Sequence, residues 1–353
     1  MINKQKYQKK KGSYTLFIIF FKFVSFLMLR NYLCRHIVYI LKKINSIFEF
    51  SSTKKTIVTL GTFDGVHLGH KSILKKLREA TENGLYESVV LTFFPHPRMV
   101  LQQEHSLQLL NSMEEKRMLL EKSGIDHLII HPFDAAFSKL SAEAFVQKVL
   151  VDQLKIHKII IGYDHRFGEN RTANITDLME FGKKYHFEVA QINAEEINEI
   201  AVSSTNIRTA LANGSIQLAN RYLGYDYFFS GKVVKGKQLG RTLGFPTANL
   251  TLLEPYKLIP KKGAYIVSST LNNTRIFGMM NIGHNPTLGE NERSIEVHFF
   301  DLNEDLYDKV LFIALLEFIR PEEKFSSLDA LKTQLQKDRE FSKKYLLDNL
   351  QTS

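Results

Sequence analysis

The chain has 353 residues, of which 44% are hydrophobic and 24% are charged, and this predicts a globular protein of two domains. Its formal net charge of +10 comes from residues 1–43, which hold ten Lys or Arg and no acidic residue. The remaining 37 basic and 37 acidic residues balance, so composition gives no case for a nucleic-acid partner. The single cysteine, Cys34, excludes an intrachain disulfide and a thiolate metal cluster. This fits a reducing compartment, and we expect a cytoplasmic protein.

Residues 1–43 form a basic and apolar leader. Its apolar run is about 15 residues long and contains Lys22, which is short of the roughly 20 residues that span a bilayer. No small-residue cleavage site follows it. Two hypotheses are open: a weak membrane anchor, or an over-extended start with Met28 or a later residue as the true first residue. The second is favoured, so membrane contact is not the main expectation.

Strands and helices alternate from residue 56 onward. Apolar β-branched runs predict strands, and apolar stripes at helical spacing predict helices. In chain order we expect a strand at 56–60, a helix at 70–83, a strand at 88–93, a helix at 111–124, a strand at 127–131, a helix at 141–154, a strand at 158–162, and short helices at 205–214 and 215–224. The rhythm predicts a Rossmann-like α/β domain whose parallel sheet is covered on both faces. Gly214 and Gly224 are the expected ends of the two short helices.

Short β-rich runs follow Gly224. We expect strands at 227–234, 263–270, 275–283, 294–300 and 309–319, and the Gly, Asn and Pro between them favour a small antiparallel barrel or sandwich. Ser326 or Ser327 is the expected cap of a final helix. The predicted organisation is a leader at 1–43, a first domain at 44–223 and a second domain at 224–353.

The stretch GTFDGVHLGH, residues 61–70, separates the first strand from the first helix. Ligands of open parallel sheets bind at this edge, where glycines allow a close backbone approach and a helix start offers N–H groups to phosphate. His67 and His70, three apart, can both face this mouth and donate to phosphate oxygens. The pattern predicts a nucleotide site rather than an ordinary turn. Its candidate nucleotide-binding residues are Gly61, Phe63, Asp64 and Gly65.

The stretch GKVVKGKQLGRTLGFPTANL, residues 231–250, predicts a second site. Pro246 fixes the exit of a Gly-rich loop, after which Thr247 and Asn249 present oxygens in alternation. Such oxygens suit Mg²⁺ bound to ATP phosphates. The alternative is a turn-rich hairpin in which the buried Thr247 and Asn249 side chains make hydrogen bonds to backbone groups.

The strand at 294–300 carries a candidate general base. Its alternation places Glu296, His298 and Phe300 on one face, and a carboxylate near a bound phosphate can take the proton of an attacking alcohol. Without further context, a Glu on a solvated strand face is the alternative.

The motifs resemble those of a known family. HLGH matches the HxGH signature of nucleotidylyltransferases, and GTFDGVHLGH resembles the opening of bacterial bifunctional riboflavin kinase/FAD synthetases. GYDHRFGENRTAN and VSSTNIR are similar to the next two motifs of that family, although VSSTNIR alone is equally a helix cap. GRTLGFPTAN, NIGHNPT, EVHFFD, DLY and IRPEEKF then resemble the riboflavin kinase module, a small β-barrel. The likeness runs from about Ile44 to beyond Asp338.

The resemblance implies roles for individual residues. In the first domain it implies flavin and adenine contacts by Asp164, Arg166 and Phe167, and triphosphate contacts by Ser204, Thr205 and Arg208. In the second it implies Mg-ATP binding by Gly244, Thr247 and Asn249, activation of the ribityl 5′-hydroxyl by Glu296, and flavin contacts by Arg320, Glu322 and Phe325. The chain departs from the family pattern at Thr62, His165, Asn174, Asn285 and Asp308.

The implied function is a pair of successive reactions on one chain. The second domain would phosphorylate riboflavin to FMN with ATP and Mg²⁺, and the first would adenylylate FMN to FAD and release pyrophosphate. One alternative is another HxGH transferase or an aminoacyl-tRNA synthetase core, which would want a lysine-rich second signature and leaves the barrel unexplained. Another is a flavin-binding regulator or membrane-tethered scaffold without turnover. Sequence does not give the oligomeric state.

Overall fold

The computed structural model describes residues 41–102, 106–162, 165–192, 202–236, 239–284 and 293–350. The hypotheses about most of the leader, and the expectations for Asp164 and Asn285, therefore lie outside the described residues. Leu41–Ser353 form one compact unit. Among the described residues, none of the helices combines the length and apolar character that crossing a bilayer requires.

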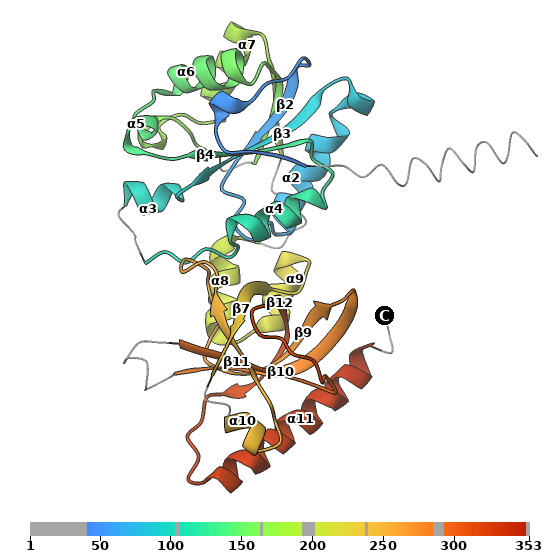
Figure 1. Ribbon diagram of the computed structural model, residues 1–353. Helices are drawn as coiled ribbons and strands as arrows, with labels where there is room; N and C mark the ends of the chain where they lie inside the picture. Colours follow the sequence, from blue (N-terminus) through green and yellow to red (C-terminus); the bar gives the residue numbers. More distant parts are fainter. Residues whose placement is uncertain are drawn as a thin grey trace, which may run out of the picture. The chain divides into compact units, whose positions relative to one another are not determined.

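The first half of this unit is built on a six-stranded sheet (Figure 1). Every pair of neighbouring strands is parallel, in the order β1-β4-β3-β2-β5-β6, which confirms the predicted parallel sheet. The strands are β1 (Lys42–Ile44), β2 (Thr56–Leu60), β3 (Glu87–Phe94), β4 (His127–Pro132), β5 (Ile156–Gly162) and β6 (Glu188–Ile192). β1 was not expected from the sequence, and its first two residues, Lys42 and Lys43, lie in the predicted leader.

The helical segments that go with this sheet include the three helices that the sequence predicts and others that it does not, such as Ile175–Tyr185. They are η1 (Ile47–Glu49), α2 (Leu68–Glu79), η2 (Glu82–Gly84), α3 (Pro97–Leu101), α4 (Met113–Glu121), α5 (Ala135–Ser138), α6 (Ala142–Phe145), η3 (Val146–Gln153), η4 (Glu169–Arg171) and α7 (Ile175–Tyr185). The single helix expected at 141–154 is α6 continued by the π-helical η3.

Apolar clusters cover both faces of the sheet. Val58 and Leu60 of β2 belong to one cluster together with apolar residues of η3 and α7. Ile57 belongs to the other, with Leu74 of α2 and Leu120 of α4. Because side chains alternate along a strand, one short apolar run supplies both cores.

The second half is a closed barrel, as the resemblance implied, and not a sandwich. Its antiparallel strands follow the order β10-β11-β8-β7-β12-β9. They are β7 (Phe228–Val234), β8 (Ala248–Leu252), β9 (Gly263–Leu271), β10 (Thr274–His284), β11 (Arg293–Phe299) and β12 (Val310–Pro321), with α10 (Leu239–Thr242) between β7 and β8. The final helix, α11 (Leu328–Leu350), lies beside β10 (Figure 1). Ser327 caps it, since its Oγ accepts from the Ala330 N–H at 3.1 Å.

Two helices connect the sheet to the barrel. α8 (Ser204–Asn213) and α9 (Ile216–Leu223) end at Gly214 and Gly224 in left-handed conformation, as predicted. Their buried residues Ile207, Leu211 and Leu223 share one core with Tyr227 and the barrel strands. The helices therefore fold onto the barrel although they precede the expected boundary, which itself stays a prediction.

Replacing Leu211 by Ala should destabilise this shared core. The side chain is completely buried, so we expect a loss of about 2–5 kcal/mol in the free energy of unfolding. Urea denaturation followed by circular dichroism measures it. Leu347→Ala in α11, where the side chain is 60% exposed, should change stability by no more than about 0.5 kcal/mol. Equal effects of the two substitutions would contradict the packing of α8 onto the barrel.

Candidate active sites

The HxGH loop, residues 61–67, makes a tight turn between β2 and α2. Phe63 and Val66 adopt positive φ angles of 46° and 37°, and Gly65 one of 87°. A Cβ atom on Gly65 would lie 2.7 Å from the side chain of Leu110, so only glycine fits there. The loop is thus fixed at the edge of the sheet where parallel strands end.

His67 and His70 lie together at the start of α2. His67 caps the helix by accepting the His70 N–H on its Nδ1 at 3.4 Å, and the two rings stack with centroids 3.7 Å apart. Burial lowers the pKa of His70 well below 6.5, and the nearby His67 and Lys116 lower it further. His70 is therefore a neutral imidazole near pH 7. The two histidines are neighbours, and their role at a phosphate site stays a prediction.

Asp64 of the HxGH loop contacts two other parts of the chain, Leu110 and helix α8. It accepts the Leu110 N–H at 2.9 Å and forms an ion pair with Arg208 of α8. The backbone carbonyl of Asp64 accepts the Ser204 hydroxyl at 2.8 Å. The structure thus brings together Asp64, Ser204 and Arg208, which were predicted from separate motifs.

The segment VSSTNIR forms the start of α8. Ser203 caps α8 by accepting the Asn206 N–H at 3.2 Å, so the helix-cap interpretation holds for that residue. Ser204 is left to contact the HxGH loop, and Thr205 is exposed in the first turn. A phosphate at Arg208 would share the guanidinium with Asp64.

Two residues near this loop were missed from the sequence. Lys116 of α4 is buried and donates to the Thr62 carbonyl at 2.6 Å; burial lowers its pKa to about 8, against the opposing effect of Asp64. His96 follows β3 and caps α3, and the charges acting on it include Asp64, Lys116 and Arg208. The position of His96 at the end of a predicted strand was a usable signal, whereas Lys116 looks like any lysine of an amphipathic helix.

The expected flavin residues of the first domain, Arg166 and Phe167, do not lie together as Asp64, Ser204 and Arg208 do. Arg166 is exposed, while Phe167 is buried in the core cluster of the sheet face opposite to that of Phe63. The Phe167 backbone bridges Ala173, and the His165 ring stacks on Phe167 at 6.3 Å. Phe167 is thus a core residue of this face of the sheet, and its flavin contact stays a prediction.

In the barrel, the candidate base and the candidate metal ligands are neighbours. Glu296 of β11 pairs in register with Asn249 of β8 and with Asn281 of β10. The Thr247 hydroxyl donates to Glu296 Oε2 at 3.3 Å, and a Cβ on Gly236 would collide with the Asn249 amide. The predicted alternation of β11 is confirmed, since Glu296 is accessible and its neighbours are buried.

His298 holds the loop that precedes Thr247. Its Nδ1 lies 2.9 Å from the Pro246 carbonyl, and its ring meets the edge of Phe245 at 5.4 Å. Burial lowers its pKa, and the bond to Pro246 opposes that effect. The Gly-rich loop remains tightly turned, with Gly244 at a φ of 84°.

The third expected group surrounds the end of β12. Arg320 forms a forked ion pair with Asp338 of α11, with contacts of 2.8 and 3.1 Å, and its guanidinium lies 5.5 Å from the Phe325 ring. Glu322 lies beside Gly283, where a Cβ would come within 2.6 Å of its Oε1. Arg320 therefore ties the barrel to α11, and its flavin contact stays a prediction.

A metal ion at the barrel site would depend on few protein oxygens. Within the described part of the chain, no three His, Cys, Asp or Glu side chains cluster as metal ligands. Thr247 and Asn249 offer neutral oxygens beside Glu296, a donor set that suits Mg²⁺ when substrate phosphates and water complete the shell.

Comparison with known proteins finds two family models that match the chain one after the other. A model of the FAD synthetase family matches residues 49–206, and a model of the riboflavin kinase family matches residues 223–346. The first match contains the HxGH loop, and the second contains Thr247, Asn249 and Glu296.

Curated relatives cover most of the chain. A bifunctional riboflavin kinase/FMN adenylyltransferase of Buchnera aphidicola subsp. Schizaphis graminum is 38% identical over 86% of this chain and 96% of its own. The proteins of that name from Listeria monocytogenes (38% identical, 80% of this chain, 90% of its own) and Escherichia coli K12 (34%, 84% and 96%) are similar. A crystal structure from Streptococcus pneumoniae, described as a macrolide-efflux protein, has a TM-score of 0.78 and 30% identity, and covers 86% of this chain and 99% of its own.

The imidazole of His96 should stay neutral down to strongly acidic pH. Burial, the largest cause, lowers its pKa from 6.5 to about 4. Because this folded-state pKa lies below the unfolded value, the contribution of neutral His96 to stability is fully present above pH 6.5 and is lost as the pH falls through the folded pKa. A two-dimensional NMR titration of the histidine side chains measures it, with His96→Gln to assign the signal. A midpoint at or above 6.5 would contradict the buried placement.

Proposed function

Because this chain belongs to the family of bifunctional riboflavin kinase/FMN adenylyltransferases, we propose residue roles for its two reactions. It phosphorylates riboflavin to FMN and then adenylylates FMN to FAD. The observation that carries this conclusion is that one chain matches both family models in order, over 49–206 and 223–346. Each matched region holds one of the two polar clusters described above.

We assign phosphorylation to the cluster on β8 and β11. Glu296 takes the proton of the ribityl 5′-hydroxyl as this oxygen bonds to the γ-phosphorus of ATP, and the bond to the β,γ-bridging oxygen breaks to release ADP. The 3.3 Å contact between Thr247 and Glu296 supports placing the base next to the nucleotide loop at Gly244. Proton removal by a placed base contributes about 10²–10⁴-fold in rate.

The metal of this reaction is proposed to be Mg²⁺, held by Thr247 and Asn249. When bound, it would neutralise charge on the β- and γ-phosphates. Thr247, just before β8, and Asn249 of β8 would position it. His298 fixes the loop that carries Thr247 through the Pro246 carbonyl at 2.9 Å. The flavin ring would lie near Arg320, Glu322 and Phe325.

We assign adenylylation to the HxGH loop. A phosphate oxygen of FMN attacks the α-phosphorus of a second ATP, and the α,β-bridging oxygen leaves with pyrophosphate. His67 and His70 donate to phosphate oxygens whose charge grows in the transition state, and the start of α2 adds its N–H groups. The close backbone of Gly61, Phe63, Asp64 and Gly65 would accommodate the nucleotide.

The remaining contacts of the adenylylation site are also proposals. Ser204, Thr205 and Arg208 would hold the triphosphate from the start of α8. The contacts of Ser204 and Arg208 with Asp64 support this, and Thr205 is exposed in the same helical turn. Asp164, Arg166 and Phe167 would shape the flavin side. A cytoplasmic location is proposed on the single cysteine of the chain.

Separate substitutions should separate the two reactions. Glu296→Gln should lower FMN formation by about 10²–10⁴-fold while FMN supplied directly is still converted to FAD. His70→Ala should lower FAD formation by about 10²–10³-fold and let FMN accumulate. Chromatography of flavins after incubation with ATP and Mg²⁺ measures both. Each variant is the folding control of the other, and loss of both activities in either one would contradict two separate sites.

Removing divalent metal should stop phosphorylation. Because the charge stabilisation that a metal supplies is worth several kcal/mol, EDTA should lower FMN formation by at least about 10²-fold. Adding back Mg²⁺ should restore it, whereas Ca²⁺, which is larger and prefers more ligands, should restore less. Unchanged FMN formation after exhaustive chelation would sink the metal assignment.

A further inference from the structure

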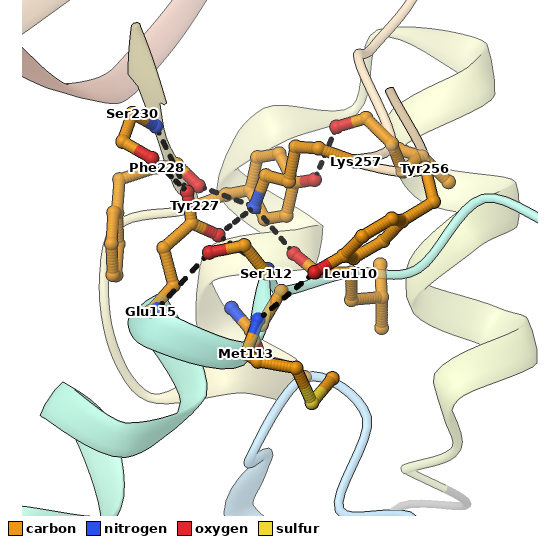
Figure 2. A network of polar contacts seen from close by, with 12 residues as sticks. Leu110, Ser112, Met113, Glu115, Tyr227, Phe228, Ser230, Tyr256 and Lys257 are labelled. Carbon is orange, nitrogen blue, oxygen red and sulfur yellow. Dashed lines mark hydrogen bonds and ion pairs between the residues drawn. The ribbon is translucent and has the colours of Figure 1, made fainter. Parts of the chain in front are cut away.

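A buried ion pair joins the two matched regions of the chain. Lys257 lies between β8 and β9, and its Nζ is 2.7 Å from Oε2 of Glu115 in α4. The Lys257 side chain is 2% exposed and that of Glu115 is not exposed at all. Figure 2 shows this ammonium group surrounded by acceptors from both regions.

Every polar atom of this pair has a partner. The Lys257 ammonium also donates to the carbonyls of Leu110 at 2.5 Å and Phe228 at 2.7 Å. The Glu115 carboxylate also accepts the N–H of Ser112, and the N–H and hydroxyl of Ser230, at 2.9 to 3.1 Å. Burial lowers the pKa of Lys257, and Glu115 opposes that effect. A fully paired network of this kind holds its members rigidly.

The same barrel segment also holds the backbone of residues 109–110. The Leu109 N–H donates to the Tyr256 carbonyl at 2.7 Å, and the Leu258 N–H donates to the Leu109 carbonyl at 2.8 Å. Together with the bond from Lys257 to the Leu110 carbonyl, three hydrogen bonds fix two consecutive residues of the first region.

Those residues in turn hold the HxGH loop. The Leu110 N–H donates to the Asp64 carboxylate at 2.9 Å, and the Leu110 side chain fills the space next to Gly65. Lys116, which follows Glu115 in α4, donates to the Thr62 carbonyl at 2.6 Å. Two steps of contact therefore connect the barrel to the loop. Lys257 binds Leu110 and Glu115. Leu110, and Lys116 next to Glu115, bind Asp64 and Thr62 of the loop.

We propose that Lys257, a residue of the riboflavin kinase region, is a positioning residue for FMN adenylylation in the other half of the chain. It acts by fixing Leu110 and the start of α4, which fix the HxGH loop. The inference rests on the assignment of adenylylation to that loop. A buried ion pair is weak support for stability, because well-packed neutral residues serve as well. What the pair supplies here is the fixed place of the segment that supports the loop.

The test compares both reactions in one purified full-length chain carrying Lys257→Met. Methionine keeps most of the volume but donates no hydrogen bond to Leu110. We expect kcat for adenylylation of supplied FMN to fall by about 10²-fold, since misplacing reacting groups by an ångström has that effect. KM for FMN should change little, because the flavin contacts proposed above lie outside this loop. Phosphorylation of riboflavin, measured as total FMN plus FAD, should stay at the wild-type rate.

Lys261→Met is the matched control. Lys261 lies four residues further along the same segment, and its exposed ammonium contacts only the Phe318 ring among the interactions seen for its side chain. We expect both reactions to be unchanged. Hydrogen exchange of peptides covering residues 61–70 should accelerate in Lys257→Met and not in Lys261→Met, with barrel peptides unaffected in both. Faster exchange throughout, with both activities lowered in parallel, would show a purely structural role and overturn the proposal.

A second variant removes the risk that an unpaired Glu115 prevents folding. Glu115→Gln combined with Lys257→Met removes both charges of this pair, so neither is left buried without its partner, but the Leu110 carbonyl still lacks its donor. The double variant should fold, phosphorylate riboflavin normally and remain slow in adenylylation. Wild-type adenylylation in the double variant would overturn the proposal. If His70→Ala still makes FAD, the assignment to the HxGH loop has failed; if only His70→Ala is slow, the role of Lys257 alone has failed.

Discussion

The buried carboxylate of Asp64 is the constraint on which the first site depends. It sits inside a loop with three positive φ angles, and such a loop keeps its shape only when its polar groups are satisfied from outside. Leu110 and Arg208 satisfy the carboxylate, while Ser204 satisfies the carbonyl. Residues far away in sequence therefore help to place the two histidines. The motif at 61–70 alone does not fix the conformation of the loop.

The second site is constructed differently. Glu296, Asn249 and Asn281 occupy one row across three barrel strands, so strand register sets their spacing. Glu296 itself lies on a regular strand, and its place does not depend on a loop. One site is thus as rigid as a hydrogen-bonded sheet, and the other depends on contacts with its neighbours. This difference explains why the barrel is the half that supports its partner.

Local patterns predicted much of this protein. The β-branched run at 56–60 and the Gly residues at 214 and 224 act within a few residues, so strand β2 and the ends of α8 and α9 were predictable. Predicting that Glu296 and Asn249 are neighbours requires the register between their strands, which local patterns do not give. The family resemblance implied instead that both residues belong to one site. Lys116, Glu115 and Lys257 were not predictable, because a buried charged residue has no local signature. Each has a partner that lies 54 to 147 residues away along the chain. β1 was not predicted because it is three residues long and two of them are lysines, so it shows no alternation of apolar residues.

β1 has a consequence for how the sheet avoids self-association. It pairs with β4 through three residues, Lys42, Lys43 and Ile44, and so covers what would otherwise be an open row of N–H and C=O groups on an apolar strand. A short outer strand carrying two positive charges is a poor template for a second molecule. Removing the residues up to and including Ile44 would expose the edge of β4. We expect such a chain to aggregate through strand pairing, although both active sites would be unchanged.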